Sequence, residues 1–118
     1  MHITRFEDAQ PYEAPNHRDV RALRLQGFDP HGPKANWVGL SHFLPGGGAG
    51  PDASPLEKTY VVLEGEIEVR VGQRVERLQR LDSCFIPGGE QREVRNPSNA
   101  VATMLVIMPY PATATPSV

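Results

Sequence analysis

The alternation of apolar and polar residues is clearest over residues 56–71, which read LEKTYVVLEGEIEVRV. In residues 67–71 every second residue is apolar and the residues between them are charged, which is typical of a strand with one buried face. Residues 61–63 are apolar on both faces, so this strand needs cover on each side. With the Glu64-Gly65 pair between them, the two segments are predicted to form a hairpin.

Similar short patterns recur along the chain between glycine- and proline-containing turns. The further strands predicted from them are residues 22–26, 37–44, 74–78, 83–86, 93–96 and 102–108, with an edge strand at 2–6. Residues 28–36 and 45–55 are rich in glycine and proline and are predicted to be loops, the second a loop or distorted strand at the mouth of a site. Because 12 prolines and 11 glycines leave little room for helix, we expect an all-β sandwich or barrel.

The length of 118 residues suits one domain with a single core. Within it we expect an N-terminal arm and first strands over residues 1–36, the barrel core over 37–109, and a flexible tail over 110–118. Since the apolar strands have two faces to cover, we also expect the protein to form a homodimer.

Charge and hydropathy narrow the classes of partner. The formal net charge of −2 gives no excess of positive charge for binding nucleic acid or an anionic membrane. The chain has no apolar run long enough to span a bilayer, and its N-terminus lacks the apolar segment of a signal peptide. One cysteine, Cys84, cannot form an internal disulfide. These features favour a cytoplasmic protein.

Two segments resemble the paired motifs of the cupin superfamily, whose members are small antiparallel jelly-roll β-barrels. In the first segment, Gly46 and Gly65 stand at the spacing of the first motif. In the second, LDSCFIPGGEQREVRN, the matching residues are Pro87, Gly89 and Asn96. The resemblance spans roughly residues 39–109 and implies an antiparallel jelly-roll barrel with a pocket inside it.

The residues that hold a metal ion in many cupins are replaced in the first motif. One register places Lys58 at the position of the family's glutamate ligand, with Asp52 and Ser54 at the two histidine positions. A register shifted by one residue places Glu57, Pro51 and Ala53 there instead. Neither register supplies a histidine. The choice of register decides whether Glu57 or Lys58 faces the interior.

In the second motif, Arg92 replaces the third histidine. Iron, manganese and zinc sites of this type need several neutral imidazoles together with a carboxylate, and a permanently charged guanidinium repels a divalent cation. The resemblance therefore implies a cupin pocket without a metal ion or other cofactor.

The pocket is predicted to be basic, and we expect it to bind a small anionic organic molecule. Arg92 and Lys58 would contact the anion, because cations inside an apolar barrel are costly without a negative partner. Glu57 or Asp52 would supply further contacts. In the alternative interpretation Arg92 pairs with Glu57 or Asp52 as a structural substitute for the metal, and Lys58 points outward.

Several side chains are candidates for catalysis. In a metal-independent enzyme resembling the isomerases, epimerases and cyclases of the superfamily, Lys58, His42 or Tyr60 would move a proton, while Arg92 stabilises negative charge. The same residues also suit a binding protein without catalytic activity. A third possibility is a dioxygenase-like cupin that holds a metal through Glu57 and His42. The sequence leaves open whether the protein is an enzyme.

Most of these residues also have purely structural explanations. His42 and Tyr60 are equally compatible with core packing. His17 lies in a polar, proline-flanked segment, so a surface position is expected for it. Cys84 has no histidine near it in the sequence, which favours a buried, inert thiol over a nucleophile.

Overall fold

The protein's structure, a computed structural model, describes residues 1–112 and contains nine β-strands and one turn of 3-10 helix in that range. The elements are η1 (Phe6–Asp8), β1 (Gln10–Tyr12), β2 (His17–Gln26), β3 (Asn36–Ala53), β4 (Lys58–Glu64), β5 (Ile67–Val71), β6 (Arg74–Leu78), β7 (Ser83–Ile86), β8 (Gln91–Arg95) and β9 (Ala102–Pro109). The predicted all-β class is confirmed. Within residues 1–112, no helix has the length and apolarity required to cross a membrane.

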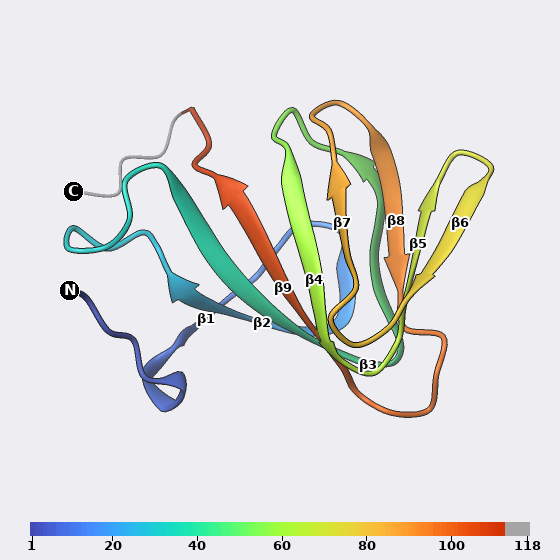
Figure 1. The fold of residues 1–118 in the computed structure, drawn as a ribbon, viewed down its shortest axis with the longest axis horizontal. Coiled ribbons are helices and arrows are strands. Elements are labelled where there is room, and N and C mark those ends of the chain that lie inside the picture. Colours follow the sequence, from blue (N-terminus) through green and yellow to red (C-terminus); the bar gives the residue numbers. More distant parts are fainter. Residues whose placement is uncertain (113–118) are drawn as a thin grey trace.

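The strands form a nearly closed antiparallel barrel in the order β6-β5-β8-β3-β9-β4-β7, with β1 and β2 added beside β3 (Figure 1). The long strand β3 belongs to both walls of the barrel. Its first half pairs with β2 and β9, whereas its second half pairs with β8 and with the first two residues of β2. We refer to β2, the first half of β3, β9, β4 and β7 as the first sheet, and to the second half of β3, β8, β5 and β6 as the second sheet.

The predicted hairpin over residues 56–71 is wrong. Both strands exist, but β4 pairs with β7 and β9, whereas β5 pairs with β6 and β8. The chain crosses from the first sheet to the second at Gly65, which has a φ of 79°. A Cβ atom there would lie 3.0 Å from the Cα of Ala102, so the crossing requires glycine. A local alternation pattern cannot distinguish such a crossing from a hairpin.

Other boundaries also differ from the prediction. Residues 45–55 are mostly strand, because β3 continues through the glycine-rich segment with a bulge between Ala49 and Asp52. Residues 2–6 form no strand, and β2 begins five residues earlier than expected, at His17. Tyr110, placed in the flexible tail by the sequence, is half-buried and donates a hydrogen bond to the carbonyl of Pro33. The rest of the predicted tail, residues 113–118, lies outside the described residues.

Strand pairing shows which side chains face the barrel interior. On β4, Tyr60 and Val62 lie opposite Val106 and Met104 of β9, and all four side chains are buried in the core. Because neighbouring strand residues point to opposite faces, the alternate residues of β4, β9 and the first half of β3 lie on the outer face of the first sheet. The core therefore lies between the two sheets.

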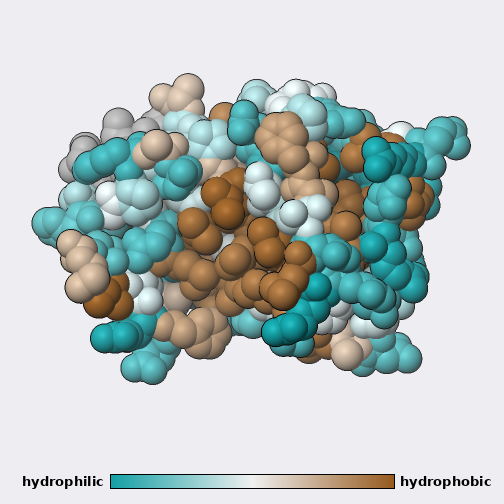
Figure 2. Space-filling view, viewed as in Figure 1, coloured by the Kyte–Doolittle hydropathy of each residue, from teal (hydrophilic) through white to brown (hydrophobic). Residues whose placement is uncertain are grey.

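The outer face of the first sheet is apolar where four of its strands meet. One row across paired strands consists of Phe85, Thr59, Ile107 and Val38. The next row consists of Val61, Leu105, Leu40 and Leu23. We call these two rows the outer patch. Figure 2, drawn from the side on which β9, β4 and β7 are nearest to the viewer, shows apolar residues gathered in the middle of this surface with hydrophilic residues beside them.

Candidate functional site

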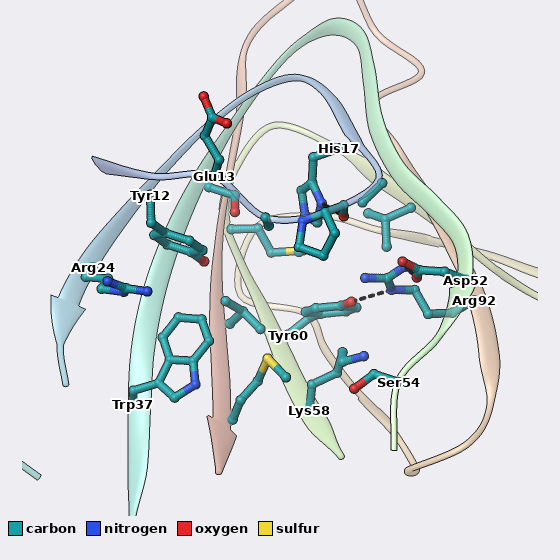
Figure 3. Close-up of a pocket in the computed structure, with 18 of the residues that line it drawn as sticks. Tyr12, Glu13, His17, Arg24, Trp37, Asp52, Ser54, Lys58, Tyr60 and Arg92 are labelled. Carbon is teal, nitrogen blue, oxygen red and sulfur yellow. Dashed lines mark hydrogen bonds and ion pairs between the residues drawn. The ribbon is translucent and has the colours of Figure 1, made fainter. Parts of the chain in front are cut away.

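The barrel contains a cavity of about 300 Å³ whose wall includes the segment between β1 and β2. This volume is at the lower end of the range for small-molecule sites. Most of its wall is apolar or aromatic. One group of polar side chains lies together at one end, and Arg24 and Glu13 lie on the opposite side, as Figure 3 shows. That polar end consists of Asp52, Ser54, Lys58, Tyr60 and Arg92.

Lys58 points into the cavity, and Glu57 does not. The side chain of Lys58, at the start of β4, is only 4% exposed and borders the cavity. Glu57 is exposed and is absent from the cavity wall. Since neighbouring residues of an extended chain alternate in direction, only one of the two can face inward. The ligand contact considered for Glu57 is therefore not supported by its position.

Arg92 joins the two sheets. From β8 its Nε donates a hydrogen bond of 2.8 Å to Tyr60 Oη on β4. Its Nη1 forms an ion pair with Oδ1 of Asp52, which lies directly opposite on β3. Arg92 is 7% exposed, so these partners compensate a nearly buried guanidinium. The pairing with Asp52 is the one foreseen in the structural interpretation of Arg92, although Lys58 points inward and not outward.

The glycine-rich part of β3 makes this close approach possible. Gly50 has a φ of 87°, and a Cβ atom there would lie 3.0 Å from Nη1 of Arg92. Any larger residue would therefore be strained in its backbone and would crowd the guanidinium. The segment expected at the mouth of a site is instead part of the wall that holds Arg92 in place.

Lys58 has no partner of its own. Among residues 1–112, no hydrogen bond or ion pair within normal distance reaches its ammonium group. Burial lowers the pKa of Lys58, and the nearby charge of Arg92 lowers it further, while Asp52 acts in the opposite direction. The result is a partly desolvated amine that faces a cavity and is easier to deprotonate than a surface lysine.

Tyr60 keeps its proton more firmly than an exposed tyrosine. Burial raises the pKa of Tyr60, and this effect outweighs the charge and hydrogen bond of Arg92, which lower it. Its hydroxyl oxygen accepts the bond from Arg92, so its own proton is available to a ligand. Tyr60 is therefore placed as a hydrogen-bond donor at the polar end of the cavity.

His42 lies away from the cavity, so the structure does not support it as a proton carrier there. It follows Ser41 and precedes Phe43, which both line the cavity, so its own side chain points to the outer face of β3. There its Nδ1 is 3.2 Å from Oγ1 of Thr103, and the ring of Phe6 packs edge-on against it at 6.2 Å. The sequence could not decide this orientation because both faces of residues 37–44 are rich in apolar residues.

The side chains at the polar end do not suit the metal ion that the fold family often holds. The positions of its ligands carry Asp52, Ser54, Lys58 and Arg92, of which only Asp52 has a carboxylate, and that carboxylate is paired with Arg92. No group of three or more histidine, cysteine or acidic side chains is arranged to hold a metal ion anywhere in residues 1–112. Glu57 and His42, considered together as ligands, do not meet in the cavity.

Several residues of the cavity were not predicted as site residues. Tyr12, His17 and Arg24 come from β1 and β2, and Trp37 begins the inward face of β3. His17 is half-buried rather than at the surface, its Nδ1 lies 2.8 Å from the Pro15 carbonyl, and burial lowers its pKa. The alternation in HRDVRALRL was the available signal, but charges on both faces of this segment concealed which face is inward.

Two comparisons of sequence identify the family. The model of the cupin domain matches residues 39–108, which is more than half of the chain. A Mycobacterium tuberculosis protein named Beta-D-galactosidase is 40% identical over 111 residues, covering 94% of this chain and 96% of that protein.

Solved structures with the same fold support this assignment. The polyketide cyclase RemF from Streptomyces resistomycificus matches with a TM-score of 0.81 and 21% identity, covering 92% of this chain and 79% of the cyclase. An RmlC-like cupin from Shewanella frigidimarina matches with a TM-score of 0.76 and 17% identity, covering 96% of this chain and 94% of that one. The antiparallel barrel and the match over residues 39–108 lead to one conclusion, that this chain belongs to the cupin family.

Proposed function

We propose that the protein binds a small anionic organic molecule at the polar end of the cavity, without a metal ion. The observation that carries the proposal is Lys58, a residue that is 4% exposed, borders the cavity and has no hydrogen bond or ion pair to its ammonium group within residues 1–112. At this end Lys58 and Arg92 bring two positive charges, and Asp52 brings one negative charge. An anion would compensate the remaining charge, and burial would make that contact strong.

The geometry also suits proton transfer. The lowered pKa of Lys58 increases the fraction of neutral amine that can accept a proton from the ligand. Tyr60 and the free edge of Arg92 lie beside it and would stabilise negative charge on a ligand oxygen. A metal-independent isomerase, epimerase or cyclase needs both a proton acceptor and groups that stabilise negative charge. Binding without turnover needs only the contacts with the anion, so turnover of a bound ligand distinguishes the two.

The binding proposal is tested by calorimetric titration with benzoate, a carboxylate small enough for the cavity. Lys58→Met keeps a side chain of similar length but removes the charge, and we expect it to weaken binding by about 10- to 100-fold, the worth of one charged hydrogen bond. Arg92→Met should weaken binding to a similar extent. Arg95→Met is the matched control, because Arg95 is exposed on the same strand as Arg92.

The contrary outcomes are equally specific. Unchanged benzoate affinity in Lys58→Met would remove Lys58 from the site, and the proposal with it. An equivalent of iron, manganese or zinc retained by protein purified without chelator, with binding that depends on it, would contradict the metal-free mode.

A second candidate function is hydrolysis of a β-galactoside, which the name of the 40% identical relative suggests. The specific observation in its favour is that two carboxylic acids, Asp52 and Glu13, border the same cavity. Glycoside hydrolases use two carboxyl groups on either side of the scissile bond, one as an acid and one as a base or nucleophile. Trp37 offers an aromatic surface to a sugar ring.

Release of nitrophenol from nitrophenyl β-D-galactoside measures this activity directly. If the protein is such a hydrolase, Asp52→Asn and Glu13→Gln each lower kcat/KM by at least about 100-fold. Glu57→Gln is the control, because Glu57 is exposed and outside the cavity wall. Absence of hydrolysis by the wild type, or equal rates in all three variants, would exclude this function.

We also propose that two copies associate through the outer patch. Its two rows run across paired strands of one sheet, so a two-fold axis would bring identical rows together and needs no other partner. Phe85 is 54% exposed at one edge of the patch. Pairing with a second copy would remove from water the apolar area of Phe85 and of the half-buried members of the patch, whereas Leu40 and Leu23 are already buried within one chain. A cytoplasmic location stays a prediction from the sequence.

A further inference from the structure

Arg24 occupies the end of the cavity opposite Arg92. Figure 3 shows its guanidinium beside Tyr12 and Trp37, with Tyr60 lying between this end and Arg92. Arg24 comes from β2, where it pairs with Gly39 of β3, so it shares the inward face with the cavity residues of that sheet. The sequence and the family resemblance assign it no role.

The guanidinium of Arg24 is held by aromatic rings and has no anion. Its Cζ lies 4.1 Å from the centre of the Phe28 ring and 5.0 Å from that of Tyr12. Its Nε is buried without a hydrogen-bond partner, and within residues 1–112 no carboxylate lies within 4.0 Å of it. Asp8 and Asp29 border a second hollow, which Arg24 also lines, but neither forms an ion pair with it.

Packing of the aromatic residues does not require this charge. Trp37 already packs edge-on against Tyr12 and Phe28, each at 5.5 Å between ring centres, and Phe28 packs against Tyr110 at 5.0 Å. Ring contacts also leave the N–H groups of a guanidinium without acceptors. An arginine that only filled space here would be a costly choice compared with methionine or leucine.

We infer that Arg24 binds a second acidic group of the ligand. This inference rests on the proposed function, in which Lys58 and Arg92 bind the first. The two ends are separated by an apolar wall that includes Trp37, Val106 and Met104. The ligand class is therefore a small organic dianion with an apolar middle, one acid group reaching Arg24 and the other reaching Lys58.

Titration with linear α,ω-dicarboxylates from succinate to suberate measures the spacing between the two anion-binding ends of the cavity. Each dicarboxylate is compared with the monocarboxylate of equal chain length. We expect one length to bind the wild type at least about 10-fold more tightly than its monocarboxylate, the worth of one charged hydrogen bond. Arg24→Met should abolish this preference and leave monocarboxylate affinity within about twofold. Arg24→Lys, which keeps the charge, should retain part of the preference.

Arg21→Met is the matched control, since Arg21 lies on the same strand, is exposed, and pairs with the outward-facing His42. Melting temperatures of all variants show whether any loss of preference comes from unfolding. The inference is overturned if no dicarboxylate is preferred, or if Arg24→Met weakens both partners of a pair equally. If the inference on Arg24 fails in this way but Lys58→Met loses monocarboxylate binding, the proposed function still stands. If the wild type binds no carboxylate, both the inference and the proposed function are overturned.

Discussion

The distribution of polar and apolar residues between the two faces of strand β4 is the reverse of that in an ordinary surface strand. Its inner face carries Lys58 and Tyr60 before it becomes apolar at Val62, and its outer face carries Val61 within the outer patch. In a strand that only builds a core, the cation would point to solvent and the apolar residues inward. This distribution fits the proposals that the inner face at this end contacts a ligand and that the outer face contacts a second copy.

The largest expected effect concerns the outer face. If it is a dimer interface, Phe85→Lys places two buried charges in it, one per copy, and should weaken dimerisation by roughly 1,000-fold. Val75→Lys is the matched control, because Val75 is also exposed but lies on β6 in the second sheet. Light scattering on the wild type and Val75→Lys should give twice the chain mass of 13.0 kDa, and on Phe85→Lys the single mass. A monomeric wild type at micromolar concentration would rule the interface out.

The inner face predicts a pH dependence of binding. A carboxylate needs the charged form of Lys58, whose pKa lies below its usual 10.5. As the pH rises, the affinity for benzoate should therefore begin to fall at a pH below 10.5. Once the pH exceeds the pKa of Lys58, the affinity should fall by up to about tenfold per pH unit. Titrations between pH 7 and pH 10 check this, and Lys58→Arg should flatten the profile. A profile that is flat in the wild type would contradict the contact.

The stability of the free protein should change in the opposite direction. Between the lowered pKa of Lys58 and 10.5 the unfolded chain binds more protons than the folded one, so the free energy of unfolding rises with pH. Lys58→Met removes both this slope and the cost of the buried charge, and should stabilise the protein by about 1 kcal/mol. Urea unfolding of both proteins at pH 7 measures the gain. A variant less stable than the wild type would mean that Lys58 has a structural partner.

The smallest effect is expected at His42. Since it lies on the outer face with Thr103, His42→Gln should change the affinity for benzoate by less than about twofold and cost about 0.5–1 kcal/mol through the lost hydrogen bond. Titration and urea unfolding of this single variant provide both numbers. A large loss of affinity with an unchanged free energy of unfolding would return His42 to the site.

Much of the barrel could be predicted from local patterns, and the family spacing predicted Arg92 inside it but left open whether Lys58 or Glu57 faces inward. Alternation identified the strands because a half-buried strand must repeat with period two. It does not identify their partners, so the pattern of residues 56–71 predicts a hairpin although Gly65 carries the chain between sheets. Pairing between distant segments depends on the whole fold, and no local residue encodes it.

The candidate site was predicted in part for a similar reason. Family motifs cover only the middle of the chain, so Arg92 and its pairing with Asp52 could be considered in advance. Arg24 and His17 come from β2, outside the motifs, and enter the cavity only because β2 pairs with β3. A charged residue on a strand is expected at the surface unless the fold supplies a cavity for it.

The hydrogen bond between Arg92 and Tyr60 spans the interior from the second sheet to the first. It is one of the few polar contacts within residues 1–112 that join the two walls, together with the bond from Asn96 to the carbonyl of Phe43. A molecule that contacts Lys58 and Arg92 at once would add a further polar connection between the two sheets. When the cavity is filled, the backbone amide protons of both β4 and β8 should then exchange with solvent more slowly. Hydrogen exchange in both sheets would therefore report whether a ligand is bound.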